Sequence, residues 1–282
     1  MPGILYVVAT PIGNLEDVTL RALRILKEVS IIAAEDTRRT SRLLQHYSIS
    51  TRTTSLHEHN EHARAPALVA RLLAGESIAV VSDAGTPGLS DPGAQLVAAA
   101  HVAGVKVEPI PGPSAALALV SAAGFLTTEF LFLGFPPVRS KARNKWLSAV
   151  ATAPFLLVVY EAPHRIEATL RDLLDVLGDR KAAIGRELTK AHEQLVVRPI
   201  SEHLRLLGEP RGEYALVVDR FQQEAAGSAE ALEPSEIARQ FGELTKNRGL
   251  GRREAIRSLA ERYRVASREI FDLLERAKNS VD

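Results

Sequence analysis

The chain has 282 residues, of which 46% are hydrophobic and 24% are charged, and its formal net charge is +1. This length suits two domains, or two domains with an appendage, and the composition is typical of a globular protein rather than a disordered or fibrous one. The absence of cysteine excludes disulfides and thiolate metal sites and indicates a reducing, cytoplasmic location.

Apolar, β-branched runs alternate with helical patterns through the first half of the chain. The runs cover residues 4–10, 30–36, 77–83 and 106–112. The first run is broken by Pro11 and is too short for a signal peptide or a membrane span, so no membrane association is expected. Segments such as LRALRILKEV repeat apolar residues every three or four positions. Strands that alternate with helices predict a mostly parallel sheet covered on both faces.

The second half predicts a mixed sheet and a helical C-terminal segment. Runs at 129–135 and 154–162 flank the basic helix candidate SKARNKWLSAVATA, and three further runs follow at 182–188, 193–200 and 214–221. These three are too closely spaced for crossover helices, which favours antiparallel pairing. The class is therefore α/β, and the predicted parts are an N-terminal α/β domain 1–113, a second α/β domain 114–221, a linker 222–233 and a helical segment 234–282.

Three loops rich in glycine and proline follow predicted strands: TPIGN (10–14), DAGTPGLSDPG (83–93) and PGPSA (111–115). Ligands of open α/β sheets bind beyond the carboxyl ends of strands, so we expect these loops to meet. Gly85 and Gly88 would let the backbone approach a ligand, and Asp83 could accept hydrogen bonds from an amine or a ribose hydroxyl. Ser114 could cap a helix or reach the same ligand. Neither usual nucleotide fingerprint is present, so the loops indicate a nucleoside-like ligand held differently, or are simple turns.

Several further motifs occur in order over residues 3–221. They are LYVVATPIGNLEDVT, EDTRRTSRLL, LHEHNE, VSDAGTPGLSDPG, PIPGPSA, FLGFPP, YEAPHR, GRELTK and GEYALVV. Together they resemble the tetrapyrrole methylase family, the class III methyltransferases that use S-adenosylmethionine. Within it they are most similar to a branch that methylates the ribose 2′-hydroxyl of a decoding-region cytidine in small-subunit (16S) ribosomal RNA.

The resemblance implies two α/β domains of the tetrapyrrole methylase type, with S-adenosylmethionine in the cleft between them and usually a homodimer. It implies cofactor contacts motif by motif. The implied cofactor-binding residues are Asp83, Ala84, Gly85, Pro87, Ser114, Ala115, Gly134, Tyr160, Glu161, Tyr214 and Ala215.

The chemistry expected of such an enzyme needs alignment and a proton acceptor rather than a metal. The methyl group of a sulfonium is electrophilic, whereas a ribose hydroxyl is a poor nucleophile until its proton leaves. In SLHEHNEH, we expect His57, Glu58 or Glu61 to act as the acceptor or to contact the ribose. A zinc site would need three converging ligands, and none is predicted. Solvated histidines at a helix start are the structural alternative.

Basic residues that could contact RNA phosphates occur in several segments. The predicted set is Arg38, Arg39, Lys141, Arg143, Lys145, Arg186, Lys190, Arg248, Arg252, Arg253 and Arg257. The first two could instead be solvated at a helix start capped by Asp36. The segment SKARNKW places basic residues around Trp146, which suits phosphate contact with base stacking, or equally an amphipathic helix with a core tryptophan.

The segment 234–282 carries 11 Lys or Arg and 8 Asp or Glu. This excess of positive charge, with helix-turn-helix-like spacing, favours RNA contact over a simple helical cap or dimer contact. DNA binding is not expected, because nothing else in the chain is typical of a regulator. Small ribosomal subunits are the expected partner. The alternatives are methylation of a tetrapyrrole or another small molecule, and a nucleotide-binding, ribosome-associated module without catalysis.

Overall fold

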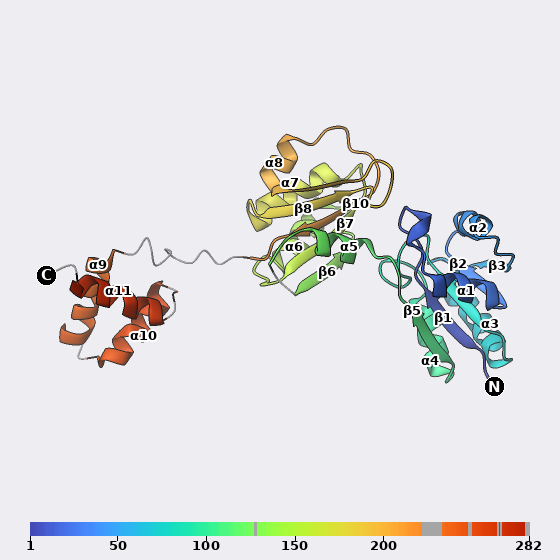
Figure 1. The fold of residues 1–282 in the computed structure, drawn as a ribbon, viewed down its shortest axis with the longest axis horizontal. Coiled ribbons are helices and arrows are strands. Elements are labelled where there is room, and N and C mark those ends of the chain that lie inside the picture. Colours follow the sequence, from blue (N-terminus) through green and yellow to red (C-terminus); the bar gives the residue numbers. More distant parts are fainter. Residues whose placement is uncertain (127–128, 222–232, 248–249, 264, 266, 280–282) are drawn as a thin grey trace. The chain divides into compact units, whose positions relative to one another are not determined.

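The computed structural model describes residues 1–126, 129–221, 233–247, 250–263, 265 and 267–279 (Figure 1). The chain divides into two compact units, Met1–Phe221 and Gln222–Asp282. Of the predicted linker 222–233, only Glu233 lies within the described residues. Among the helices of these ranges, none has both the length and the apolar character that a bilayer span requires.

The first sheet is entirely parallel, with strand order β3-β2-β4-β1-β5. Its strands are β1 (Ile4–Val8), β2 (Ile31–Ala34), β3 (Thr53–Ser55), β4 (Ile78–Val81) and β5 (Lys106–Ile110). The connecting elements are η1 (Leu15–Asp17), α1 (Leu20–Glu28), α2 (Thr37–His46), α3 (Glu61–Leu73) and α4 (Ala94–Val102). The alternation of apolar runs with helical patterns therefore predicted β1, β2, β4 and β5 but missed β3, a three-residue strand of polar residues that forms no apolar run.

Both faces of the first sheet are buried, which explains why its central strands are continuously apolar. Ile31 and Ala33 of β2 belong to the core that includes α3 and α4. Ile32 and Ala34 belong to the core that includes α1 and α2. Successive strand side chains point to opposite faces, so a strand covered on both sides needs apolar residues at every position.

The second sheet is mixed, with strand order β6-β7-β10-β8-β9. Its strands are β6 (Phe130–Gly134), β7 (Leu156–Glu161), β8 (Lys181–Arg186), β9 (Gln194–Pro199) and β10 (Tyr214–Val218). Only β6 and β7 are parallel, and the predicted antiparallel pairing of the last three strands is confirmed. Helix α5 (Ala115–Ala122) packs in the core on one face. The other core includes α6 (Ser140–Ser148), α7 (Ile166–Leu177) and α8 (Ile200–Arg205).

The C-terminal unit has a small apolar core of its own, formed by residues such as Ile237, Leu259 and Ile270. Its elements are α9 (Pro234–Gly242), the π-helical turn η3 (Glu243–Asn247), α10 (Arg252–Tyr263) and α11 (Ser267–Asn279). The predicted class, two α/β parts followed by a small helical segment, is confirmed.

Candidate active site

The three glycine-rich loops meet, as their positions after neighbouring strands predicted. Thr10 and Gly85 exchange two backbone hydrogen bonds of 2.8 and 2.9 Å in an isolated antiparallel bridge. The hydroxyl of Thr86 donates to the carbonyl of Pro113 at 3.3 Å, which ties in the third loop. Because β4, β1 and β5 are adjacent, the loops after them lie at one edge of the first sheet.

Two glycines of the loop 83–93 are required by the backbone itself. Gly85 and Gly88 have φ of +80° and +82°, in the left-handed region that side chains rarely adopt. A Cβ on Gly88 would meet no atom within 4 Å, so this backbone borders open space. The loop can therefore bring its peptide groups close to a ligand.

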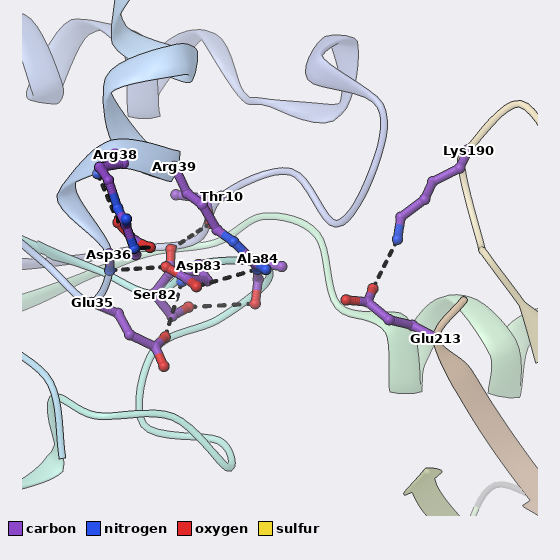
Figure 2. A network of polar contacts seen from close by, with 10 residues as sticks. All are labelled: Thr10, Glu35, Asp36, Arg38, Arg39, Ser82, Asp83, Ala84, Lys190 and Glu213. Atoms are coloured by element: carbon purple, nitrogen blue, oxygen red, sulfur yellow. Dashed lines mark hydrogen bonds and ion pairs between the residues drawn. The ribbon is translucent and has the colours of Figure 1, made fainter. Parts of the chain in front are cut away.

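Asp83 is held in one orientation by two neighbours from the end of β2 (Figure 2). Its Oδ1 accepts from the backbone N–H of Asp36 at 2.9 Å, and its Oδ2 lies 3.2 Å from Nη1 of Arg39. Its own N–H donates to Oε2 of Glu35 at 3.1 Å. The motifs EDTRR and VSDAG are thus parts of one polar network, because β2 and β4 pair side by side.

Arg38 and Arg39 have different surroundings. Arg38 is bound to Asp36, the cap of its own helix, with Nη2 and Oδ2 3.1 Å apart and 90% of its side chain exposed. These hydrogen bonds hold the pKa of Asp36 at about 2. Arg39 is the residue paired with Asp83. Both arginines were predicted to contact RNA. Arg39 instead orients Asp83, the residue expected to bind the cofactor.

Carboxylates gather around this network and make it electronegative. Burial and the nearby charges of Glu35 and Asp83 together raise the pKa of Asp91 to about 6, in spite of a hydrogen bond from Ser82 that lowers it. Burial also raises the pKa of Glu35. Such groups favour a cationic ligand, because a positive charge would relieve their repulsion. S-adenosylmethionine, with its sulfonium and ammonium groups, fits this set of donors and charges.

The second sheet adds Tyr160 to the same region. The Tyr160 hydroxyl accepts from the backbone N–H of Ala116 at 3.0 Å and is also bonded to Ser114. Burial raises the Tyr160 pKa, and the charge of Asp91 contributes to this rise. The serine predicted as a possible cap makes no side-chain cap bond in α5. The Ser114 hydroxyl instead joins the start of α5 to β7.

The four residues predicted on β7 and β10 divide between two faces of the sheet. Tyr160 and Ala215 are cross-strand partners in the core that includes α5. Glu161 and Tyr214 are also partners but point the other way. The buried Glu161 carboxylate accepts from the N–H of Ala162 at 2.7 Å and pairs with Arg165 at 3.1 Å. The side chains of Glu161 and Tyr214 are therefore committed to the core, which leaves only their backbone for the predicted contact.

Gly134, at the end of β6, lies against the loop 83–93. A Cβ at this position would come within 2.9 Å of the Ser90 hydroxyl, and φ here is +66°. The loop after β6 therefore approaches the loop that carries Asp83. Phe135 follows Gly134, and its ring makes an edge contact with Tyr160 at a centroid distance of 5.7 Å. Sequence reasoning missed Phe135, although the motif FLGFPP contains it.

Of the candidate proton acceptors, His57 and Glu58 precede a helix and Glu61 begins it. Helix α3 begins only at Glu61, and the preceding residues form a turn in which the N–H of His57 donates to Oδ1 of Asn60. Glu61 is 3% exposed, and its Oε1 accepts from the N–H groups of Gly93 and Leu96 at 3.0 Å each. Glu61 thus caps α4, which corrects its prediction as a proton acceptor.

Of the other two candidate acceptors, Glu58 is exposed and His57 is half-buried. His57 has a ring nitrogen, Nε2, 2.9 Å from Nδ2 of Asn60. Either residue could still be the predicted proton acceptor, because neither side chain is fully buried in a structural contact.

The motif GRELTK forms a second cluster, beside the loop TPIGN. Lys190 bridges the carboxylates of Glu187 and Glu213 at 2.9 Å each. Figure 2 shows its contact with Glu213. The N–H of Asn14 donates to the Thr189 hydroxyl at 3.0 Å. An open hollow at this junction is lined by Gly13, Asn14, Leu15, Glu16, His46, Thr189, Lys190 and Ala191. The predicted RNA contact Lys190 is therefore at the hollow, while Arg186 donates to the carbonyl of Arg211.

The basic helix α6 corrects one prediction. Arg143 is 3% exposed and forms a buried ion pair with Asp172, with Nη2 and Oδ2 2.6 Å apart. It cannot contact a phosphate and has a structural role. Trp146 packs against the core beside α7, so it is not an exposed stacking surface. Lys141 and Lys145 are exposed and stay available for RNA.

The basic residues predicted in the C-terminal unit are only partly described. Arg248 lies outside the described residues. Arg252, Arg253 and Arg257 are exposed on α10. Arg252 also lies over the Phe271 ring and 3.4 Å from Glu275. This distribution is compatible with the predicted contact surface.

Residues 4–203 match the profile of the family described as Tetrapyrrole (Corrin/Porphyrin) Methylases. The chain is 43% identical over 277 residues to the "Ribosomal RNA small subunit methyltransferase I" of Synechocystis sp., covering 96% of this chain and 97% of that one. It is 41% identical to the protein of the same name in Bacillus subtilis, covering 96% and 93%.

Two solved structures show a similar fold at low sequence identity. One is a diphthine synthase, with a TM-score of 0.63, 15% identity and coverage of 77% of this chain and 90% of that chain. The other is the uroporphyrin-III C-methyl transferase of Thermus thermophilus complexed with S-adenyl homocysteine, with a TM-score of 0.56 and 21% identity. The match covers 77% of this chain and 97% of that chain.

Proposed function

Because the chain belongs to the tetrapyrrole (corrin/porphyrin) methylase family, we propose that it methylates small-subunit ribosomal RNA with S-adenosylmethionine as the donor. The chain is a methyltransferase that uses this cofactor. The observation that carries the site assignment is the fixed orientation of Asp83 where three loops converge. The similarity to named ribosomal RNA methyltransferases extends over nearly the full length of both chains.

When bound, the cofactor supplies an electrophilic methyl group on a sulfonium. The residues proposed to hold it are Asp83, Ala84, Gly85, Pro87, Ser114, Ala115, Gly134, Tyr160 and Ala215, with backbone contacts from Glu161 and Tyr214. Asp83 would accept hydrogen bonds from it, and the carboxylates of Glu35 and Asp91 would favour its positive charge. The loop glycines would allow close approach of the backbone.

The finer proposal is that the acceptor is the ribose 2′-hydroxyl of a cytidine in the decoding region of 16S ribosomal RNA. It rests on the order of motifs, which resemble the branch with that activity. His57 or Glu58 would take the hydroxyl proton. Arg38, Lys141, Lys145 and Lys190, with the basic face of α10, would contact phosphates. We propose that the substrate is the assembled small subunit and that the enzyme is a cytoplasmic homodimer.

The test is transfer of labelled methyl to small ribosomal subunits from cells that lack this protein, followed by digestion to nucleosides. We expect the label on the ribose 2′-oxygen of cytidine. Label on a base would contradict the ribose assignment. An absence of label on both subunits and naked RNA, with cofactor binding intact, would contradict the RNA substrate and favour a small-molecule acceptor. The Asp83→Ala variant, which should not bind the cofactor, is the matched control for background labelling.

A further inference from the structure

Phe135 is an exposed aromatic residue on a fixed support. Its side chain follows β6 and the residue is 54% exposed. Its ring meets that of Tyr160 at an angle of 60°. Tyr160 also contacts Phe132 edge-on, and its hydroxyl is bonded to the N–H of Ala116. The support of the Phe135 ring is therefore anchored to both the sheet and α5.

Two arginines donate hydrogen bonds to the backbone of the loop that carries Phe135. Arg165 donates to the carbonyl of Pro136 at 2.5 Å. Arg143 donates to the carbonyls of Pro137 and Val138 at 3.2 Å each. Both arginines are themselves ion-paired with buried carboxylates of β7 and α7. Three consecutive carbonyls are thus fixed, so presentation of the ring requires little ordering when a ligand binds.

The position of this loop relates it to the cofactor site. Gly134 lies against Ser90 of the loop 83–93, and the charge of Asp91 in the same loop contributes to the raised pKa of Tyr160. The exposed Leu89 belongs to the same loop, at 51% exposure. Exposed apolar side chains therefore occur both in the loop that holds Asp83 and in the loop that approaches it.

Three exposed cations follow Phe135 in the sequence. Arg139, Lys141 and Lys145 are exposed and form no ion pair with any residue that the structure describes. Lys141 and Lys145 are four positions apart on α6, so they share a face of that helix. Helix α6 is joined to the loop after Phe135 through Arg143. An exposed ring near cations is the combination that binds a single-stranded nucleotide, with its base stacked and its phosphate neutralised.

We propose that Phe135 is a stacking platform for an unpaired nucleobase of the RNA substrate, and that Arg139, Lys141 and Lys145 contact the phosphates next to that base. This inference rests on the proposed function and names the surface that positions the RNA. Phe135 takes the role that the sequence suggested for Trp146, which is partly buried and packs against the core. Phe135 is a binding residue and takes no part in the transfer itself.

The experiment measures binding of small ribosomal subunits without turnover, in the presence of S-adenosylhomocysteine, together with steady-state methyl transfer. Phe135→Ala is expected to weaken RNA binding about tenfold, the order of magnitude of one base stack, and to raise KM more than it lowers kcat. Phe135→Tyr should restore affinity, whereas Phe135→Leu should not. Phe130→Ala is the matched control, because Phe130 is a partly exposed phenylalanine at the opposite end of β6.

Several outcomes would overturn the inference. Equal RNA affinity of the wild type and Phe135→Ala would remove the stacking role. Restoration by Phe135→Leu would show simple apolar packing. Loss of S-adenosylhomocysteine affinity in Phe135→Ala would place the ring over the cofactor instead. Absence of methyl transfer by the wild type contradicts the proposed function and is distinguished from these results by the separate binding measurement.

Discussion

Nη1 of Arg39 lies 3.2 Å from Oδ2 of Asp83, although the two residues are 44 positions apart and follow different strands. The contact arises because β2 and β4 pair in parallel, so that the residues after them emerge at the same edge. Asp36 completes the arrangement through its backbone N–H. The carboxylate is thereby oriented before any ligand binds.

This orientation predicts a large effect of Asp83 on cofactor affinity. Asp83→Asn removes the negative charge but keeps an acceptor, and should weaken binding of S-adenosylmethionine by about tenfold or more, as expected for loss of a charged hydrogen bond. Asp83→Ala should abolish detectable binding. Isothermal titration calorimetry measures both. The exposed Asp17→Asn is the control, and an unchanged affinity in Asp83→Ala would contradict the site.

The buried pair between Arg143 and Asp172 predicts a stability effect. Arg143→Met leaves the Asp172 carboxylate buried without its partner and should lower the free energy of unfolding by about 3 to 5 kcal/mol. Lys141→Met, on the exposed side of the same helix, should change it by less than about 0.5 kcal/mol. Thermal unfolding monitored by circular dichroism compares them. Equal midpoints for both variants would argue against a structural role of the pair.

The raised pKa of Asp91 predicts that cofactor binding depends on pH. Because this pKa is about 6, the carboxylate is charged above pH 6 and neutral below it. Affinity for cationic S-adenosylmethionine should therefore fall as the pH is lowered from 7.5 to 5. S-adenosylhomocysteine lacks the sulfonium charge and should be less affected. In Asp91→Asn, the affinities for the two ligands should depend on pH to a more similar extent. If the two ligands still differed in pH dependence as they do in the wild type, the prediction would be contradicted.

The same pKa predicts how Asp91 contributes to stability. The folded protein binds this proton more tightly than the unfolded chain, whose ordinary value is 3.8. The free energy of unfolding therefore decreases as the pH rises from about 3.8 to 6, and above pH 6 the charged Asp91 lowers it by the full amount. Asp91→Asn should raise the unfolding midpoint at pH 7.5 and not at pH 4. A gain of equal size at both values would point to a cause other than ionisation.

Glu61 is predicted to act through α4 rather than as a base. Glu61→Gln keeps an oxygen that can accept from Gly93 and Leu96, so methyl transfer should stay near the wild-type rate. Glu61→Ala leaves both N–H groups unpaired and should cost about 1 to 3 kcal/mol of stability. Transfer assays and thermal unfolding test the two variants together. A folded Glu61→Gln enzyme without activity would restore the catalytic assignment.

The C-terminal unit is predicted to contribute to RNA affinity alone. A chain ending at Phe221 retains the whole of the other compact unit and should bind S-adenosylhomocysteine as the full chain does. It should bind small subunits more weakly, and with a smaller dependence on salt, because the cations of α10 are lost. Binding is measured over a series of salt concentrations. Full RNA affinity in the shortened chain would exclude this role.

The sequence by itself determined the order of most strands and helices, the convergence of the three glycine-rich loops and the family, but not the short polar strand β3. These features depend on local periodicity, on glycine and proline at defined positions, and on the succession of short motifs. Asp83 and Gly85 could be predicted for the same reason, because both follow directly from the end of a buried strand.

The tertiary structure alone decided which side chains of those motifs face the site. Glu61 and Arg143 appear in the sequence as exposed polar residues, but packing against α4 and α7 buries both. Tyr160 and Glu161 are neighbours in one motif, yet they point to opposite faces, and only the helices packed on each face determine which is the site. For the same reason, the sequence predicted Trp146 as the stacking residue, whereas the structure packs Trp146 against the core and leaves Phe135 exposed. Burial depends on contacts between distant segments, and local sequence does not contain them.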